Sequence, residues 1–443
     1  MLYGKAFFIS NGMKFIVQGN KKLDGEIEVR GSKNAATKAL IASLLTDEEC
    51  VLENFPQIGD AEITFDLCRV FGSEIKKDGS IVSIKTPSIK SATASALSRK
   101  NRISILALGP LLAREGKAEV PILGGDKIGN RPVDIHLSAL KSLGAEIEVL
   151  ENSYVASVPN GLKGAKIHLR YPSVGATENT ILAAVLAKGK TTIKNAAIEP
   201  EIIDLIKMLQ NMGAIIGLGA DRVIYIEGVE KMKGVKHKIL ADRNEAASFA
   251  CLAVAAKGNK IKIKGVIHEH LITFLNALRR VGGEYRVEDD GIVFWRNNGL
   301  SAIELETDTH PGFMTDWQQP FAVLLTQAEG VSIIHETVYE NRFGYIEDLN
   351  FMGANIKVFL KCLGELNCRF NGEEHPHSAV ISGPTPLKGK SLKVPDLRAG
   401  MAHLIAALIA EGESTIDGIE EIDRGYERVD ERLNKLGAEI KRI

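Results

Sequence analysis

Two kinds of apolar segment alternate along the chain. In the first kind, such as "TILAAVLA" at 180–187 and "MAHLIAALIA" at 401–410, nearly every position is apolar. In the second kind, such as "IIDLIKMLQNMG" at 202–213, apolar and polar positions recur with the spacing of a helix that has one polar face. Because a helix without a polar face must be surrounded on all sides, the first kind predicts buried helices and the second predicts helices at the surface.

The alternation repeats six times. Each amphipathic segment ends in a hydrophobic-Gly step that leads into a strand-like pattern, and the steps are 69 to 72 residues apart except for the last, which is 84. Glycine directly after a helix is the usual left-handed cap, and a regular period of such caps indicates an internal repeat. Each unit is therefore expected to contain a buried helix, a strand, a loop, an amphipathic helix and a pair of strands. The six glycines are Gly72, Gly144, Gly213, Gly282, Gly353 and Gly437.

The repeat also predicts the domain organisation. A chain of 443 residues exceeds what one core usually serves, and three units to a domain give two α/β domains with buried helices inside and sheets and amphipathic helices around them. The last unit ends with the chain and is short of strands, and the opening segment 13–31 has the pattern to supply them. We therefore expect a first domain at 33–240 and a second domain at 241–443, completed by 13–32.

Composition narrows the class of protein. The chain has 45% hydrophobic and 25% charged residues, a net charge of −1 and no long basic run, so we expect neither nucleic acid nor an anionic membrane as a partner. No apolar run approaches the length of about 20 residues that a membrane-spanning helix needs. The five cysteines are odd in number and form no CxxC pair, and the first residues lack the apolar core of a signal peptide. Together these features favour a cytoplasmic protein.

One segment falls outside the repeat. The longest spacing contains "CLGELNCRFNGEEHPHSAVISGPTPLKGK" at 362–390, whose Gly, Pro and His content indicates an inserted hairpin or loop around residues 360–388. His375 and His377 lie in this insertion, but no further ligands stand at a usable spacing. We therefore expect no metal site.

Charged residues recur where helices begin. An arginine at a helix start opposes the helix dipole unless it meets an anion, although a single one is commonly just a solvated charge. Several of them in both domains predict a pocket in the cleft between the domains, for a small substrate with more than one anionic group. They are Lys33, Arg102 and Arg398 near buried helices, with Asn34 and Asp396 beside them, and Arg131, Glu199, Arg342 and Arg424 near amphipathic helices.

Two aspartates are candidates for proton transfer. Asp126 lies in "GGDKIGN", where neighbouring glycines allow close approach to a ligand. Asp316 lies in "TDTHPGFMTDWQQPF", before the buried helix of the fifth unit. A surface turn and a helix N-cap are the alternative interpretations of these two residues. Facing one another across the cleft, they would instead divide the roles of acid and base.

Several segments together form a specific pattern. They are "GSKNAA" at 31–36, "GGDKIGNRPVDIHL" at 124–137, "PSVGATENTI" at 172–181, "HPGFMTDWQ" at 310–318, "DLRAGMAHLIAA" at 396–407 and "IDRGYERVDERL" at 422–433. With these segments the chain resembles the enolpyruvyl transferases over almost its whole length, from about residue 13. The resemblance implies two inside-out α/β barrels, each with three copies of one unit, which agrees with the repeat.

The resemblance also implies an activity. Members of the family transfer the enolpyruvyl group of phosphoenolpyruvate to a hydroxyl by addition and elimination, with release of phosphate and without a cofactor. The "RPVDIHL" and "SVGAT" segments look like the type that acts on the 3-hydroxyl of UDP-N-acetylglucosamine, at the first committed step of peptidoglycan synthesis. The alternatives are transfer to shikimate 3-phosphate and a non-catalytic paralogue that binds the nucleotide sugar.

Roles for individual residues follow from the resemblance. It implies catalytic roles for Lys33, Asp126, Asp316 and Arg424, with Asp316 as the base near the sugar hydroxyl, and supporting roles for Glu199, Asp242 and Asp396. The implied contacts to phosphoenolpyruvate are Lys33, Arg102, Arg131, Arg342, Arg398 and Arg424. The implied contacts to UDP-N-acetylglucosamine are Asn34, Arg102, Arg131, Pro132, Val133, Asp134, Ile135, His136, Ser173, Val174, Gly175, Thr315, Asp316 and Val338.

The sequence departs from the family pattern at two places besides position 126. Tyr171 stands where relatives have a lysine that can approach the nucleotide diphosphate, and Arg170 adjoins it as a possible substitute. The insertion around residues 360–388 has no counterpart that we can assign.

Asp126 stands where most members of the family carry the cysteine that fosfomycin alkylates. A carboxylic acid can donate a proton but cannot form the thioether, so we predict an active enzyme that is insensitive to fosfomycin. Its activity should stay constant during incubation with the compound, whereas an Asp126→Cys variant should lose activity with time. Time-dependent inactivation of the unaltered chain would contradict this prediction.

Overall fold

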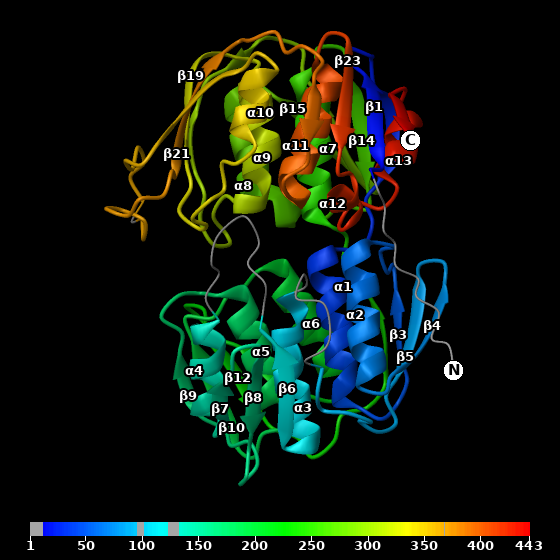
Figure 1. Ribbon diagram of the computed structural model, residues 1–443, viewed down its shortest axis with the longest axis vertical. Coiled ribbons are helices and arrows are strands. Elements are labelled where there is room, and N and C mark those ends of the chain that lie inside the picture. Colours follow the sequence, from blue (N-terminus) through cyan, green and yellow to red (C-terminus); the bar gives the residue numbers. More distant parts are fainter. Residues whose placement is uncertain (1–11, 95–101, 123–132, 367) are drawn as a thin grey trace. The chain divides into compact units, whose positions relative to one another are not determined.

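The computed structural model describes residues 12–94, 102–122, 133–366 and 368–443 (Figure 1). The chain divides into two compact units. Unit 1 contains the described residues up to Glu28, together with Asn244–Thr307 and Thr315–Ile443. Unit 2 contains Val29–Arg243 and Asp308–Met314. Each unit is described by itself below.

Unit 2 contains the two kinds of helix that the hydrophobic pattern predicts. Every residue of α5 from Ala176 to Ala184 is buried. In contrast, α6 begins with Pro200 at its first turn and buries only the face that includes Ile202, Leu205 and Leu209. The buried helices are α1 (Lys33–Ala42), α3 (Leu108–Glu115) and α5 (Val174–Ala184), and the amphipathic helices are α2 (Gly59–Val70), α4 (Asp134–Ser142) and α6 (Pro200–Asn211). The short helices are η1 (Ser43–Leu45) and η2 (Arg102–Ala107).

The strands of unit 2 form three sheets among the described residues, with the orders β13-β3-β5-β4, β6-β8-β7 and β11-β12-β10-β9. Two of these sheets combine antiparallel pairs with one parallel pair, β13 with β3 and β9 with β10. The strands are β3 (Cys50–Glu53), β4 (Glu74–Asp78), β5 (Ile81–Lys85), β6 (Lys117–Pro121), β7 (Glu146–Val149), β8 (Ser153–Ser157), β9 (Lys166–His168), β10 (Lys190–Lys194), β11 (Ile215–Leu218), β12 (Ile224–Glu227) and β13 (Val235–Lys238).

Unit 1, like unit 2, contains both buried and amphipathic helices. Two of its buried helices, α9 and α11, pack against one another, and both carry warm colours in Figure 1. Phe274 of α8 packs edge-on against Trp317 and Phe321 of α9, with ring centroids 5.6 and 5.9 Å apart. The buried helices are α7 (Arg243–Ala255), α9 (Thr315–Leu325) and α11 (Leu397–Ile409). The remaining helices are η3 (His268–Leu271), α8 (Ile272–Val281), α10 (Ile346–Phe351), α12 (Glu420–Asp423) and α13 (Val429–Asn434).

The described strands of unit 1 also form three sheets, with the orders β22-β23-β1-β24, β15-β16-β14-β2 and β17-β19-β21-β20, with β18 beside β19 in the last. The opening strand β1 lies between β23 and β24, and β2 runs parallel to β14. The strands are β1 (Lys14–Gln18), β2 (Asp24–Glu28), β14 (Lys260–Lys264), β15 (Glu284–Glu288), β16 (Gly291–Trp295), β17 (Leu300–Ser301), β18 (Glu304–Glu306), β19 (Ala328–His335), β20 (Asn355–Phe359), β21 (Ser378–Gly383), β22 (Ser391–Lys393), β23 (Glu413–Asp417) and β24 (Glu439–Arg442).

The structure confirms the predicted α/β class and the predicted order of elements. A buried helix, a strand, an amphipathic helix and two strands follow one another six times, with β1 providing a strand for the last unit. The six repeat glycines all have φ between 99° and 113°, which is the left-handed cap conformation. The inside-out barrel arrangement and the domain boundaries stay predictions. None of the helices in the described ranges is both long enough and apolar enough to cross a membrane.

Candidate active site

Asp316 lies between two arginines in unit 1. Arg342 Nη2 donates to Asp316 Oδ1 at 2.5 Å, and Arg398 Nη2 donates to Asp316 Oδ2 at 3.1 Å. Both arginine side chains are buried, whereas the Asp316 side chain is 19% exposed. Burial opposes the charge on Arg342, but the carboxylates of Asp316, Asp396 and Glu336 outweigh burial and raise the pKa of Arg342 above its ordinary value. One carboxylate that solvent can reach is thus flanked by two buried cations.

Arg398 has further hydrogen bonds through its backbone N–H and through its guanidinium. Asp396 is the N-cap of α11, and its side chain accepts hydrogen bonds from the backbone N–H groups of Arg398 at 2.9 Å and Ala399 at 3.1 Å. Arg398 Nη1 donates to the hydroxyl of Tyr426 at 3.0 Å, and this hydroxyl bonds to Ser248 Oγ at 2.9 Å. A planar guanidinium with partners on two edges is held in one orientation.

Glu336 connects two other predicted residues. Its Oε2 accepts a hydrogen bond from Thr315 Oγ1 at 2.9 Å, and its Oε1 accepts from the backbone N–H groups of Val338 at 2.9 Å and Tyr339 at 3.1 Å. Burial raises the pKa of the Glu336 carboxyl, although Arg342 and these hydrogen bonds oppose the shift. The carboxyl fixes the start of α9 to the segment that follows β19.

In unit 2, Lys33 is the first residue of α1. Its Nζ donates to Asp60 Oδ2 at 2.7 Å, and its backbone N–H donates to Asp242 Oδ2 at 3.3 Å. The Lys33 side chain is 19% exposed, and Asn34 follows it in a half-buried position. Lys33 and Asp242, for which the sequence predicts a catalytic and a supporting role, are therefore in contact. An anion that binds Lys33 would compete with Asp60.

The segment Ser173–Gly175 packs against His136. Ser173 is the N-cap of α5, and its side chain accepts from the N–H of Ala176 at 3.3 Å. A Cβ at Gly175 would lie 2.8 Å from Cε1 of His136, so only glycine lets this ring approach the helix. His136 Nδ1 lies 3.4 Å from Asn179 Nδ2. The two segments predicted to contact the nucleotide sugar are thus neighbours.

Of the predicted nucleotide-sugar residues next to His136 and Ser173, one has an exposed side chain and three pack against the core. Asp134 forms an exposed ion pair with Arg170, the arginine next to Tyr171. Val133, Ile135 and Val174 pack instead against the apolar core of unit 2.

Three charged residues lie around the start of α6. Glu199 is the N-cap residue, is 6% exposed, and its Oε2 has no hydrogen-bond partner among the described residues. Burial raises the pKa of Glu199. Glu201 accepts two hydrogen bonds from Arg243, at 3.0 and 2.9 Å, and both side chains are buried. The pairing with Arg243 compensates the burial of Glu201, whose pKa is lowered, whereas the pKa of Glu199 is raised by burial.

Glu178 interrupts the otherwise apolar interior of α5. It is 1% exposed, and neither carboxylate oxygen has a hydrogen-bond partner among the described residues. Lys38 Nζ is 4.0 Å from its Oε1. Burial raises the pKa of Glu178 to about 7, since the attraction of Lys38 only partly offsets the loss of hydration.

The remaining predicted residues are Arg102, Asp126, Arg131, Pro132 and Arg424. Arg424 follows α12, and its Nη1 donates to Glu421 Oε2 at 2.6 Å. Arg102 begins η2, and its side chain is not among those described. Asp126, Arg131 and Pro132 lie outside the described residues.

Four residues with polar contacts at these positions were not predicted from the sequence: Asp60, Glu178, Glu336 and Tyr426. A charge inside an apolar helix was a usable signal for Glu178. Tyr426 lies in the segment "IDRGYERVDERL" but carries no charge, so a pattern of charged helix starts does not include it. Asp60 and Glu336 owe their roles to contacts with Lys33 and Thr315 that no local pattern reveals.

The structure also removes the reason for expecting no metal site. That expectation rested on the lack of a CxxC pair and of further ligands at a usable spacing from His375 and His377. The structure places His377 instead with His335, Cys362 and Cys368, which follow no standard metal-ligand spacing along the chain.

The class of protein follows from the fold together with a family comparison. The sequence model of the family described as EPSP synthase (3-phosphoshikimate 1-carboxyvinyltransferase) matches residues 17–433. The chain belongs to this family of enolpyruvyl transferases, which confirms the resemblance noted from the motifs. Among solved structures, the enolpyruvyl transferase NikO from Streptomyces tendae has a TM-score of 0.86 at 22% identity and covers 97% of this chain and 99% of its own, so the two share a fold.

Particular members of the family are much more similar in sequence. A protein of Protochlamydia amoebophila named UDP-N-acetylglucosamine 1-carboxyvinyltransferase is 50% identical over 436 residues, which are 96% of this chain and 94% of that protein. The protein of the same name from Chlamydia trachomatis serovar D is 51% identical over 430 residues, with 96% and 97% of the two chains covered.

The buried Glu178 carboxyl makes stability depend on pH. Because its pKa rises from 4.5 to about 7 on folding, the folded chain binds more protons than the unfolded chain between these values. The free energy of unfolding therefore falls as pH rises through this window. Glu178→Gln has no such proton to lose. Its free energy of unfolding, compared with that of the wild-type chain at the same pH, should therefore rise by about 2 to 3 kcal/mol when the pH is raised from about 5 to about 8.

Urea unfolding of both proteins at the two pH values measures this gain. Glu146→Gln, at an exposed position on β7, is the control. Its free energy of unfolding should differ from that of the wild-type chain by the same amount at both pH values. A difference for Glu178→Gln that is equal at both pH values would contradict the prediction.

Proposed function

We propose that the chain transfers the enolpyruvyl group of phosphoenolpyruvate to the 3-hydroxyl of UDP-N-acetylglucosamine, with release of phosphate, at the first committed step of peptidoglycan synthesis. The observation that carries the proposal is the 50% identity over 96% of the chain to a protein named for this carboxyvinyl transfer. The segments Ser173–Gly175 and Asp134–His136, which look like the nucleotide-sugar type, lie together in unit 2 and support it. We place the reaction in the cytoplasm, in keeping with the cysteine pattern.

The reaction has two steps whose atoms balance. In the addition, the sugar 3-oxygen forms a bond to the central carbon of phosphoenolpyruvate, the sugar hydroxyl loses its proton, and the methylene carbon gains one. In the elimination, the bond from the central carbon to the phosphate oxygen breaks, and the new methyl group loses a proton. Since negative charge shifts onto the phosphate, fixed cations around it stabilise the transition state.

Asp316 is the residue that we assign to the sugar hydroxyl. Its oxygens are occupied by Arg342 and Arg398. Both guanidinium groups are also the expected partners of the phosphate and carboxylate of phosphoenolpyruvate. An anionic substrate that takes over these donors would release an Asp316 oxygen to accept the hydroxyl proton. Lys33 has the same arrangement in unit 2, with Asp60 as the carboxylate to be displaced.

Transfer to shikimate 3-phosphate is the second candidate. The description of the matching family model favours it, since that model is named for 3-phosphoshikimate 1-carboxyvinyltransferase. The relatives that are about 50% identical over nearly the whole chain carry the nucleotide-sugar name instead.

Phosphate release tests the acceptor directly. The purified chain is incubated with phosphoenolpyruvate and either UDP-N-acetylglucosamine, shikimate 3-phosphate or no acceptor. We expect phosphate only with the nucleotide sugar. Release only with shikimate 3-phosphate would replace the proposed substrate, and binding of the nucleotide sugar without release would indicate a non-catalytic paralogue.

Arg398→Lys should lower kcat/KM by about 10²-fold or more, because one ammonium cannot contact both Asp316 and Tyr426 as the guanidinium does. Arg286→Lys, at an exposed ion pair on β15 of the same unit, is the matched control and should leave kcat/KM unchanged. Steady-state kinetics measure both. Equal activity of the two variants would show that the guanidinium of Arg398 takes no part in the reaction.

A further inference from the structure

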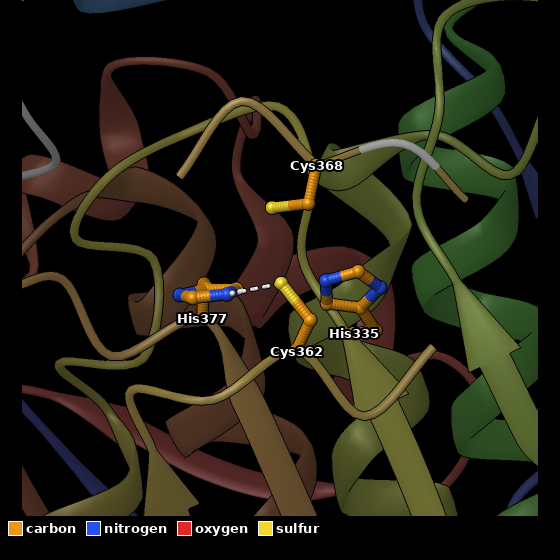
Figure 2. A group of neighbouring side chains, drawn as sticks. All are labelled: His335, Cys362, Cys368 and His377. Atoms are coloured by element: carbon orange, nitrogen blue, oxygen red, sulfur yellow. Dashed lines mark hydrogen bonds between the residues drawn. The ribbon is translucent and has the colours of Figure 1, made fainter. Parts of the chain in front are cut away.

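Four side chains with metal-binding atoms meet at one end of a sheet in unit 1. They are His335, Cys362, Cys368 and His377, here called the Cys2His2 cluster, and their ligand atoms all lie within 4.8 Å of one another. Cys362 Sγ is 3.2 Å from His377 Nε2. In Figure 2 the Cys362 sulfur lies between the two imidazole rings, and the Cys368 side chain approaches from the other side of the group. Two thiols and two imidazoles therefore converge on one position.

The strand register explains why three of the four residues converge. His335 is the last residue of β19 and pairs with Ser378, the first residue of β21. His377 directly precedes that strand. Phe359, the last residue of β20, also pairs with Ser378, and Cys362 follows shortly after it. Three ligands are thus placed at or near the ends of adjacent strands, and Cys368 lies in the middle of the inserted loop.

The hydrogen bonds of the two histidines leave one nitrogen of each ring for the cluster. His335 Nδ1 bonds to Glu306 Oε2 at 2.8 Å, and its Nε2 is buried without a hydrogen-bond partner among the described residues. Figure 2 shows that one ring nitrogen of His335 faces the sulfurs while the other points away from them. His377 Nδ1 donates to the backbone carbonyl of His375 at 2.6 Å, which leaves Nε2 toward Cys362. Carboxylate and carbonyl partners of this kind are typical of metal-bound histidines, because they fix the tautomer and raise the basicity of the ring.

The inserted loop is shaped to lie close to these groups. A Cβ at Gly364 would stand 2.1 Å from Glu306 Oε2 and 2.3 Å from His335 Nδ1, so the loop passes here only because the residue is glycine. The backbone N–H of Glu365 donates to Glu306 Oε1 at 2.8 Å. Further along, the N–H of Phe370 donates to Cys368 Sγ at 3.4 Å. The backbone therefore supports both a carboxylate behind one histidine and the sulfur of one cysteine.

The loop from Leu360 to His377 has little apolar core of its own. Its described residues form neither helix nor strand. Phe370 is buried, but Leu366 is 43% exposed. A loop of this length that buries so little apolar surface needs another source of order, which a bound metal ion can provide.

We propose that the Cys2His2 cluster binds one Zn²⁺ ion, which fastens the inserted loop to the ends of β19, β20 and β21. Zinc takes two sulfur and two nitrogen donors in tetrahedral geometry, and bonds of about 2.3 Å to sulfur and about 2.0 Å to nitrogen place the donors about 3.3 to 3.8 Å apart. The described positions need only a small inward shift to reach this arrangement. Four protein ligands leave no open coordination position, so the ion is structural, and the proposal does not depend on the proposed reaction.

Metal content tests the proposal on the full-length chain, produced without an affinity tag that binds metals. We expect about one zinc per chain by elemental analysis. Cys362→Ser and Cys368→Ser should lose this zinc. His375→Ala is the matched control, because it removes a neighbouring imidazole and keeps the backbone carbonyl that His377 uses, and it should retain the zinc. Glu306→Gln should retain the site with about 10- to 100-fold weaker affinity.

A second experiment uses the wild-type chain alone and so does not depend on whether the variants fold. After removal of the metal by a chelator, the melting temperature should fall and should return on addition of one equivalent of Zn²⁺. Co²⁺ added in place of zinc should give the absorption of a tetrahedral site with thiolate ligands. A chain that takes up neither ion, a disulfide between Cys362 and Cys368, or zinc that persists in both serine variants would each overturn the proposal.

Discussion

The fold depends on helices that have no polar face. On α5 and α11 nearly every side chain is buried, so each must be enclosed by sheets and amphipathic helices of its own unit. This need for enclosure explains why one sequence unit occurs repeatedly, since a single unit cannot cover its own apolar helix. Asp396 and Arg398 stand at the start of such a helix, where polar partners are available, whereas the carboxylate of Glu178 inside α5 has no hydrogen-bond partner among the described residues.

Charges at these helix ends are costly to bury, and within each unit they pair with one another. In unit 1 the carboxylate of Asp316 takes a hydrogen bond from each of two buried arginines, and in unit 2 Asp60 accepts from Lys33. Such pairs hold the cations in fixed orientations before any substrate binds. In the proposed reaction an anionic substrate replaces the carboxylates as partners, so that the same groups serve stability and recognition in turn.

The inserted loop must be held in place without a large apolar core of its own. It lies at the end of β19, where His335 is followed directly by Glu336, the carboxyl that accepts from Thr315. Next to Cys368, Arg369 donates to the carbonyl of Val338. The order of this loop therefore bears on residues expected at the nucleotide-sugar site, although the loop has no large apolar core. Metal ligation is one of few ways in which a polar loop can be held in a single conformation.

The sequence by itself determined the order of elements and the position of many charged groups. The hydrophobic period reports which helices are buried, and the six glycine caps mark where helices end, so the α/β units and the arginine in the first turn of α11 could be predicted locally. What only the tertiary structure decided is which distant groups meet. His377 was considered with His375, its neighbour in sequence, but the antiparallel pairing of β19 with β21 brings it to His335 instead. Glu336 and Tyr426 likewise gain their partners from packing between segments far apart in the chain. Strand register and helix packing set these contacts, and neither leaves a local pattern in the sequence.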